Sequence, residues 1–174
     1  LAVHSLKDMP SAIPSDLCLA AVAEREDPRD VLVSRGGQRL AELPHGSRVG
    51  TSSPRRVAQL RAFRPDLEFV PLRGNVETRL RKVSEGTPSA GSGQGLDGVV
   101  LALAGLKRLG LQGQAAEIIP TDVCLPAVGQ GALAVETRAG DHEAIALAQL
   151  CDHEPTRQAT AAERAFLHGL GGGC

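Results

Sequence analysis

The chain has 174 residues, of which 42% are hydrophobic and 22% charged, and its formal net charge is −1, as in an ordinary globular protein. It has no tryptophan, no tyrosine and only three phenylalanines, which nearly excludes recognition of single-stranded nucleic acid by aromatic stacking. No apolar run approaches the roughly 18 residues of a membrane span, so we expect neither a nucleic-acid nor a membrane partner.

Short apolar runs alternate along the chain with segments of helical period. We expect strands in residues 1–5, 48–53, 67–74, 96–105, 116–120 and 131–138, and helices in residues 54–63, 75–86, 105–111, 141–152 and 154–170. This alternation predicts an α/β fold with a parallel or mixed sheet covered by helices on both faces. Residues 24–30 and 125–131 are candidate crossings between two lobes, and the small residues 87–95 predict a loop.

The cysteines and histidines show no metal-like or disulfide-like pattern. The four cysteines are dispersed, without a C-x-x-C pair, and the five histidines form no H-E-x-x-H motif. A disulfide framework is not expected in a chain of this size and dispersion. The sequence therefore favours a reducing, cytosol-like compartment and no metal site.

Positive charge is concentrated in one segment. Residues 48–82 contain nine basic and three acidic residues, although the whole chain is almost neutral. Within it, Ser53 is a good helix cap and Pro54 a good first helical residue, followed by Arg55 and Arg56. Free backbone N–H groups, hydroxyls and guanidinium groups would then meet at one helix start, which favours a carboxylate or phosphate site over a capped surface helix with solvated arginines.

A second strand-to-helix junction follows at residues 73–79. Asn75 can cap that helix, Gly74 permits close approach of a ligand, and Arg73 and Arg79 can face the same anion. A simple surface helix start explains the pattern of these residues as well. Two junctions of the same type, close in sequence, favour a shared pocket at the carboxyl edge of the sheet.

Two further motifs leave alternatives open. Asp8, beside Lys7 after an apolar strand, is either a carboxylate that can transfer protons or a solvated pair before a proline turn. Cys174 follows three glycines, which suits a thiol that a bulky group must reach, and equally suits a bystander thiol at a helix exit.

These motifs and several others occur in an order that resembles the motif order of one protein family. VHSLKDMP, VGTSSPRR, LRGNVETRL, LALAGLKRLG, LPAVGQGALAVETR, ERAFL and GGGC together are similar to the porphobilinogen deaminases, also called hydroxymethylbilane synthases. The resemblance covers essentially all residues. It implies a transferase of tetrapyrrole biosynthesis that joins four porphobilinogen units head to tail, with loss of ammonia, to give hydroxymethylbilane.

The resemblance also implies roles for individual residues. Asp8 would be the catalytic carboxylate, and Cys174 would carry a dipyrromethane cofactor, the primer of chain growth, through a thioether. Contacts to the cofactor are implied for Ser5, Lys7, Thr51, Ser52, Ser53, Arg55, Arg56, Arg79 and Gly131. Contacts to the substrate are implied for Arg73, Gly74, Asn75, Arg79, Arg108 and Gln130.

The resemblance further implies two lobes like those of periplasmic binding proteins, plus the start of a third α/β domain. Residues 1–23 and 132–149 would belong to domain 1, residues 29–125 to domain 2 and residues 150–174 to domain 3, with hinge crossings at 24–28 and 126–131. The chain begins at the family's VHS-K-D motif and ends at the cofactor cysteine. We therefore expect a fragment of a monomeric parent enzyme that binds porphobilinogen and linear pyrrole intermediates, in the cytoplasm or, in a plant or alga, in a plastid.

Other classes of protein remain to be distinguished. A non-catalytic protein of the periplasmic-binding type would use the same arginines for a small polyanion, and Cys174→Ser would leave its binding intact. A nucleic-acid-binding module would show strongly salt-dependent affinity. A thiol hydrolase would need a histidine paired to Cys174, and His168 is the nearest in sequence.

Overall fold

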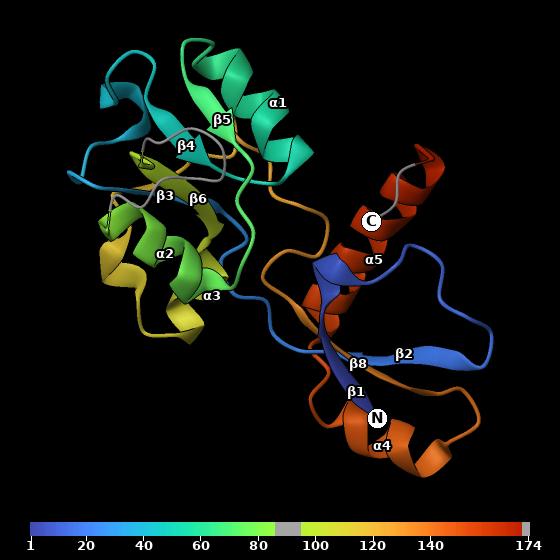
Figure 1. Cartoon of the computed structure of the whole chain (residues 1–174). Coiled ribbons are helices and arrows are strands. Elements are labelled where there is room, and N and C mark those ends of the chain that lie inside the picture. Colours follow the sequence, from blue (N-terminus) through green and yellow to red (C-terminus); the bar gives the residue numbers. More distant parts are fainter. Residues whose placement is uncertain (86–94, 172–174) are drawn as a thin grey trace. The chain divides into compact units, whose positions relative to one another are not determined.

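The computed structural model describes residues 1–85 and 95–171, and Figure 1 shows the course of the chain. The chain divides into two compact units. Unit 1 comprises Leu1–Pro28 and Ala127–Cys174, and unit 2 comprises Arg29–Pro126. The chain thus passes from one unit to the other twice, next to a proline each time. The hinge function expected of these crossings stays a prediction.

Unit 2 is built on a mixed sheet of five strands. The strands are β3 (Asp30–Ser34), β4 (Arg48–Gly50), β5 (Glu68–Val70), β6 (Gly98–Ala102) and β7 (Glu117–Ile118). Their order is β5-β4-β6-β3-β7. Strand β4 is parallel to both of its neighbours, whereas β3 is antiparallel to both of its own.

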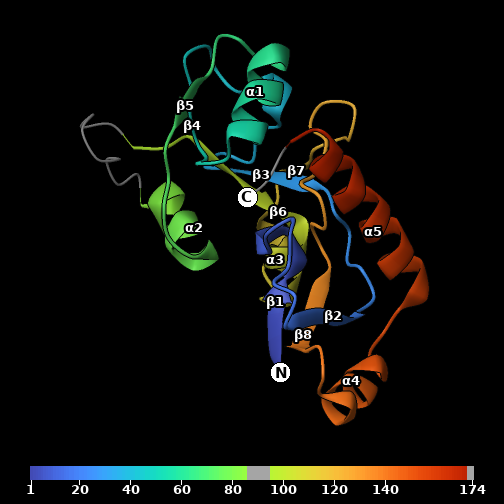
Figure 2. The same cartoon turned by 90° about the vertical axis from the view of Figure 1, so that its right-hand side faces the viewer.

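Helices cover both faces of this sheet, as the sequence predicts (Figures 1 and 2). They are α1 (Pro54–Phe63), α2 (Val76–Ser84) and α3 (Leu103–Arg108), with short 3-10 turns at Leu40–Glu42 and Gln112–Gln114. Val31 and Val99 pack with apolar side chains of α2 and α3, and Leu32 and Val100 pack with Leu60 of α1. Successive strand residues point to opposite faces, so the continuous apolar runs of β3 and β6 fill two cores.

Unit 1 contains a smaller, antiparallel sheet. Its strands are β1 (Ala2–Ser5), β2 (Leu17–Val22) and β8 (Leu133–Arg138), in the order β1-β8-β2. A 3-10 turn (Leu6–Asp8) follows β1, and the helices are α4 (His142–Gln149) and α5 (Glu154–Gly169). Ala148 of α4 packs on Ala21 and Val135. None of the helices in the described part of either unit has the length and apolar character needed to cross a membrane.

Helix α5, expected to begin a third domain, belongs to unit 1. The backbone N–H of Val22 donates to Asp152, just before the helix, at 2.9 Å. The N–H of Arg25 donates to the Thr156 hydroxyl at 3.1 Å. These hydrogen bonds join the start of the helix to the rest of unit 1. Its place in a third domain stays a prediction.

The structure also contains elements that the sequence pattern did not predict. Strand β2 was missed, and so was β3, because residues 24–30 were interpreted as one crossing, whereas β3 begins at Asp30. Helix α3 begins at Leu103, inside a run expected to be strand. The predicted loop at 87–95 lies, except for its last residue, outside the described residues.

Candidate anion-binding site

The two arginine-bearing junctions of unit 2 lie at one edge of its sheet. Strands β4 and β5 are parallel neighbours, and each leads from its carboxyl end into a helix, α1 or α2. The Ser52 hydroxyl links the two junctions, because it donates to the Leu72 carbonyl and accepts from the Leu72 N–H, both at 2.9 Å. The two motifs therefore lie next to each other, as predicted.

The start of α1 has the predicted cap. The Ser53 hydroxyl accepts from the backbone N–H of Arg56 at 3.5 Å, and Pro54 is the first helical residue. The Thr51 hydroxyl is buried and accepts from the Ser53 N–H at 3.3 Å. The hydroxyls of this motif thus hold the backbone of the junction, a role that the sequence analysis had given only to Ser53.

Arg55 and Arg56 converge on a buried carboxylate. The Nη2 atom of each arginine lies 2.7 Å from Asp30, each from a different oxygen. Asp30 is fully buried, and Arg56 is only 6% exposed. Arg56 also donates to the Val100 carbonyl at 3.0 Å. Two guanidinium groups and one carboxylate leave this cluster with a net positive charge.

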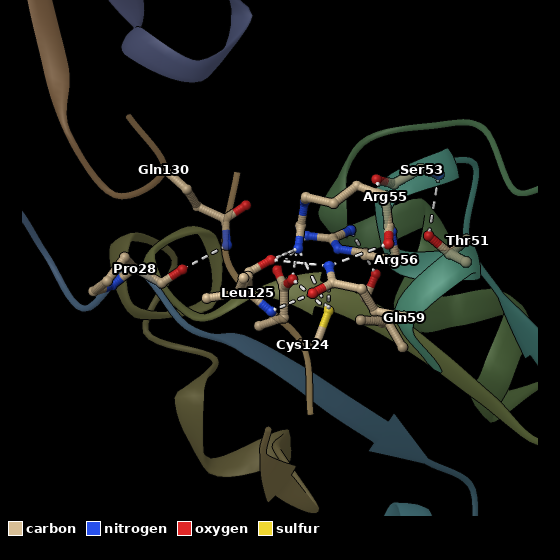
Figure 3. A network of polar contacts seen from close by, with 11 residues as sticks. Pro28, Thr51, Ser53, Arg55, Arg56, Gln59, Cys124, Leu125 and Gln130 are labelled. Carbon is tan, nitrogen blue, oxygen red and sulfur yellow. Dashed lines mark hydrogen bonds and ion pairs between the residues drawn. The ribbon is translucent and has the colours of Figure 1, made fainter. Parts of the chain in front are cut away.

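The residues just before the second crossing contact one of these arginines, Arg55 (Figure 3). Arg55 donates to the Leu125 carbonyl and contacts Cys124 Sγ at 3.4 Å. Gln59, one turn further along α1, accepts from the Leu125 N–H at 2.9 Å and donates to its carbonyl at 3.3 Å. Residues 124 and 125 are therefore held against α1 within unit 2.

Both arginines retain donors for a ligand. A guanidinium group has five N–H donors, and the Nε atoms of Arg55 and Arg56 are buried without a hydrogen-bond partner among the described residues. A buried unsatisfied donor costs about 1–3 kcal/mol. A ligand whose carboxylate oxygens reached these donors would remove that cost, so this donor set fits a carboxylate ligand.

The electrostatics of unit 2 agree with a cationic site. Burial by itself would raise the pKa of Asp30, but the charges and hydrogen bonds of Arg56 and Arg55 outweigh it and hold that pKa below its usual value. Burial and then the charge of Arg56 lower the pKa of Arg79. Arg79 is therefore within electrostatic reach of Arg56, although it lies on the other junction.

The second junction has the predicted geometry. The Asn75 side chain accepts from the Thr78 N–H at 2.8 Å and caps α2. Gly74 has a φ of 122°, which a residue with a side chain rarely adopts. The Arg79 Nε atom donates to the Gly74 carbonyl at 2.7 Å. Arg73 is exposed.

An open pocket of about 620 Å³ lies beside the two junctions. Arg73, Thr51 and Ser52 line it together with Arg61 and Phe69. The Arg61 guanidinium lies 5.9 Å from the Phe69 ring centroid. Of the predicted residues in unit 2, only Arg108 is far along the chain from both junctions, exposed in the last turn of α3.

Unit 1 carries the remaining predicted residues. Ser5 is the last residue of β1, and Lys7 and Asp8 lie in the 3-10 turn that follows, with Asp8 exposed. Gln130 is buried, and its Nε2 atom donates to the Pro28 carbonyl at 2.6 Å. Gln130, in the second crossing segment, therefore binds the first one at Pro28, and its predicted contact with substrate stays a prediction.

Gly131 is required by its surroundings. Its φ is 93°, and a Cβ there would lie 2.3 Å from the Glu26 carbonyl oxygen. The Glu26 N–H donates to the Gly131 carbonyl at 3.2 Å. Cys174, the predicted attachment point of the cofactor, lies outside the described residues.

The sequence analysis missed three members of the site, Asp30, Gln59 and Cys124. Asp30 was interpreted as part of a charged crossing, and the only signal was an acidic residue at the first position of an apolar run. Gln59 lies four residues after Arg55, the spacing of neighbours on one helix face. Cys124 gave no signal of its own. Among the described residues, no group of histidine, cysteine, aspartate and glutamate side chains could hold a metal ion.

Comparison with known proteins identifies the family of the chain. Residues 1–146 match the family model described as porphobilinogen deaminase, dipyromethane cofactor binding domain. The whole chain is 53% identical to a porphobilinogen deaminase of Syntrophomonas wolfei, of which it covers 54%, and 57% identical to one of a Roseiflexus species, of which it covers 55%. The chain thus spans about half the length of the curated relatives it matches. On this evidence, the chain belongs to the porphobilinogen deaminase family.

Proposed function

We propose that the protein to which this chain belongs condenses four porphobilinogen molecules head to tail into hydroxymethylbilane, with release of ammonia. Membership of the porphobilinogen deaminase family supports this function. The structural observation that carries it is the arginine pair of α1, whose two buried Nε donors have no acceptor among the described residues. A ligand rich in carboxylates supplies the missing acceptors.

The arginines bind the side chains of the pyrroles. Each porphobilinogen brings an acetate and a propionate group, so a growing chain accumulates negative charge. A hydrogen bond to a charged group contributes about 1.5–3 kcal/mol, and several such bonds retain the intermediates between additions. We assign this task to Arg55, Arg56 and Arg79, with Arg73 and Arg108 at neighbouring positions, and assign supporting contacts to Thr51, Ser52, Ser53, Gly74 and Asn75.

Asp8 is the catalytic carboxylate in this proposal. Its place in an exposed turn at the end of β1 leaves it accessible to a substrate. It donates a proton to the leaving ammonia, stabilises the positive charge that develops on the substrate, and later accepts the proton lost from the pyrrole carbon. Ser5 and Lys7 lie beside it and bind substrate carboxylates or the cofactor, and Gln130 and Gly131 support the same ligands.

The dipyrromethane cofactor named in the description of the family model would be held by Cys174. Its chemistry is that of a primer, a covalently attached pair of pyrroles to which the first substrate is joined. The same arginines fit the cofactor, because it is made of the same carboxylate-bearing units. This is why substitutions of Arg55 or Arg56 should impair cofactor loading as well as elongation.

The organisation of the parent protein is part of the proposal. We infer a monomer in the cytoplasm, with pyrroles as ligands and with residues 150–174 opening a third domain. The hinge segments 24–28 and 126–131 would let the first two domains adjust as the chain of pyrroles grows.

The test is turnover by the full-length parent protein. Incubation with porphobilinogen should release four ammonia molecules for each tetrapyrrole formed. Binding of porphobilinogen without release of ammonia would contradict the proposal and favour a non-catalytic polyanion-binding protein.

A further inference from the structure

Arg55 and Arg56 are adjacent in the sequence, yet their guanidinium groups meet at one point. Successive residues of an α-helix point in directions about 100° apart, because the helix has 3.6 residues per turn. The two side chains would therefore diverge unless another group drew them together. In the structure that group is Asp30, with one oxygen 2.7 Å from each arginine.

The carboxylate of Asp30 is itself firmly held. Asp30 is the first residue of β3, which lies between β6 and β7, and it pairs with Ala102 of β6. Its backbone carbonyl accepts from the Ile119 N–H at 2.8 Å. The Cys124 thiol, which Arg55 of α1 also contacts, lies 3.6 Å from Asp30 Oδ2 and donates to it. The side chain is fully buried, so water does not compete for the carboxylate.

From this arrangement we propose that Asp30 is a positioning residue, which orients the guanidinium groups of Arg55 and Arg56 for the carboxylates of the pyrrole ligand. The inference rests on the proposed function for the identity of the ligand. Asp30 does not touch the ligand in this scheme. It holds the two guanidinium groups next to each other, and their Nε atoms have no acceptor among the described residues.

Two possible roles of Asp30, balancing charge in the core and orienting the arginines, predict opposite effects of the same substitution. Asp30→Asn keeps the shape of the side chain and removes one negative charge beside the two arginines. If Asp30 only balanced charge in the core, a folded variant would be more positive and would bind an anion equally well or more tightly. If Asp30 orients the arginines, the variant binds more weakly, because the two cations repel each other and lose their common partner.

The test uses the full-length parent protein with Cys174→Ser, which blocks covalent attachment and leaves simple binding to be measured. Calorimetry gives the affinity for porphobilinogen in this background, with and without Asp30→Asn. We expect Asp30→Asn to weaken binding by at least about tenfold, as for the loss of one hydrogen bond to a charged group. Equal or tighter binding would overturn the inference if the Asp30→Asn variant has the same melting temperature as the protein with Asp30 intact.

The matched control is Asp66→Asn. Asp66 is also paired with an arginine in unit 2, at 2.7 and 2.6 Å from Arg64, but it has no contact with the arginine pair of α1. It should change the affinity by less than about twofold, as expected of a charge outside the site. An equal loss in both variants would also overturn the inference, because it would show a general effect of charge.

Two further results are decisive. If Asp30→Asn does not fold, Cys124→Val removes the thiol contact to Asp30 without changing the charge, and should weaken binding by about threefold, within the range of a lost neutral hydrogen bond. Unchanged affinity in that folded variant would overturn the inference. If the Cys174→Ser protein with Asp30 intact does not bind porphobilinogen, the proposed function fails and the inference falls with it.

Discussion

Arginine residues that lie close together in this sequence have different surroundings in the structure. Arg56 is almost completely buried and shares a carboxylate with Arg55. Arg61, on the same helix, is exposed and lies over the Phe69 ring. A buried guanidinium is costly unless its donors are satisfied. An anion that satisfied the buried Nε donors of the α1 pair would therefore stabilise the protein.

At the residue scale, Asp8→Asn should remove the proton transfers and leave much of the binding. The amide has nearly the shape of the carboxylate but cannot act as a general acid or base at neutral pH. We expect the rate of porphobilinogen consumption to fall by about 10²–10⁴-fold, with porphobilinogen still bound. Steady-state kinetics of the parent protein provide the measurement, and normal turnover in the variant would remove Asp8 from the mechanism.

The pairing of Asp66 with Arg64 predicts a dependence of stability on pH. Hydrogen bonds from Arg64 lower the pKa of Asp66 from 3.8 to about 2. Because the folded pKa is below the unfolded one, the stabilisation is complete above pH 3.8 and is lost as the pH falls toward about 2. The melting temperature of the wild type should therefore exceed that of Asp66→Asn at neutral pH.

This difference in melting temperature should shrink between about pH 4 and pH 2. Thermal unfolding of both full-length proteins across that range is the measurement. A difference that stayed constant with pH would contradict the pairing.

At the scale of elements, two parallel strands place the site. Strands β4 and β5 end at the same edge of the sheet, and the capped helices α1 and α2 begin just beyond. Polar side chains at the junction between the end of a strand and the start of a helix can reach a ligand without disturbing either core. This arrangement explains why the caps Ser53 and Asn75 lie among the predicted binding residues.

Gly131→Ala should destabilise the crossing segment. The substitution combines a positive φ with a Cβ only 2.3 Å from the Glu26 carbonyl oxygen. Strain of this kind costs about 1–3 kcal/mol for the backbone conformation alone. Gly140→Ala is the control, because its Cβ would meet no atom within 4 Å. Urea unfolding of the parent protein measures both variants, and equal midpoints would contradict this account.

The sequence predicted most elements of the site but not its internal pairing. Ser53, Pro54 and Asn75 are local signals, since a cap and its N–H partner lie three residues apart, and these predictions were confirmed. Asp30 lies 25 and 26 residues from the arginines that it binds, so its partners depend on the order of the strands. Strand β3 was missed for a local reason, because the charged residues before it concealed its start.

At the scale of the whole molecule, positive charge is concentrated in one segment rather than spread evenly along the chain. The formal net charge is −1, whereas residues 48–82 carry nine basic and three acidic residues. This distribution favours binding of a small polyanion over general affinity for nucleic acid, and both stay predictions. This distribution suits a ligand that gains carboxylates as it grows.

The most direct test of the proposed function is the intact mass of the full-length parent protein, purified from a host that makes porphobilinogen, with and without Cys174→Ser. Ehrlich's reagent is applied to both samples. The account predicts a two-pyrrole adduct that reacts with the reagent and is absent from the Cys174→Ser protein. An unmodified mass that stays unchanged after incubation with porphobilinogen would contradict it.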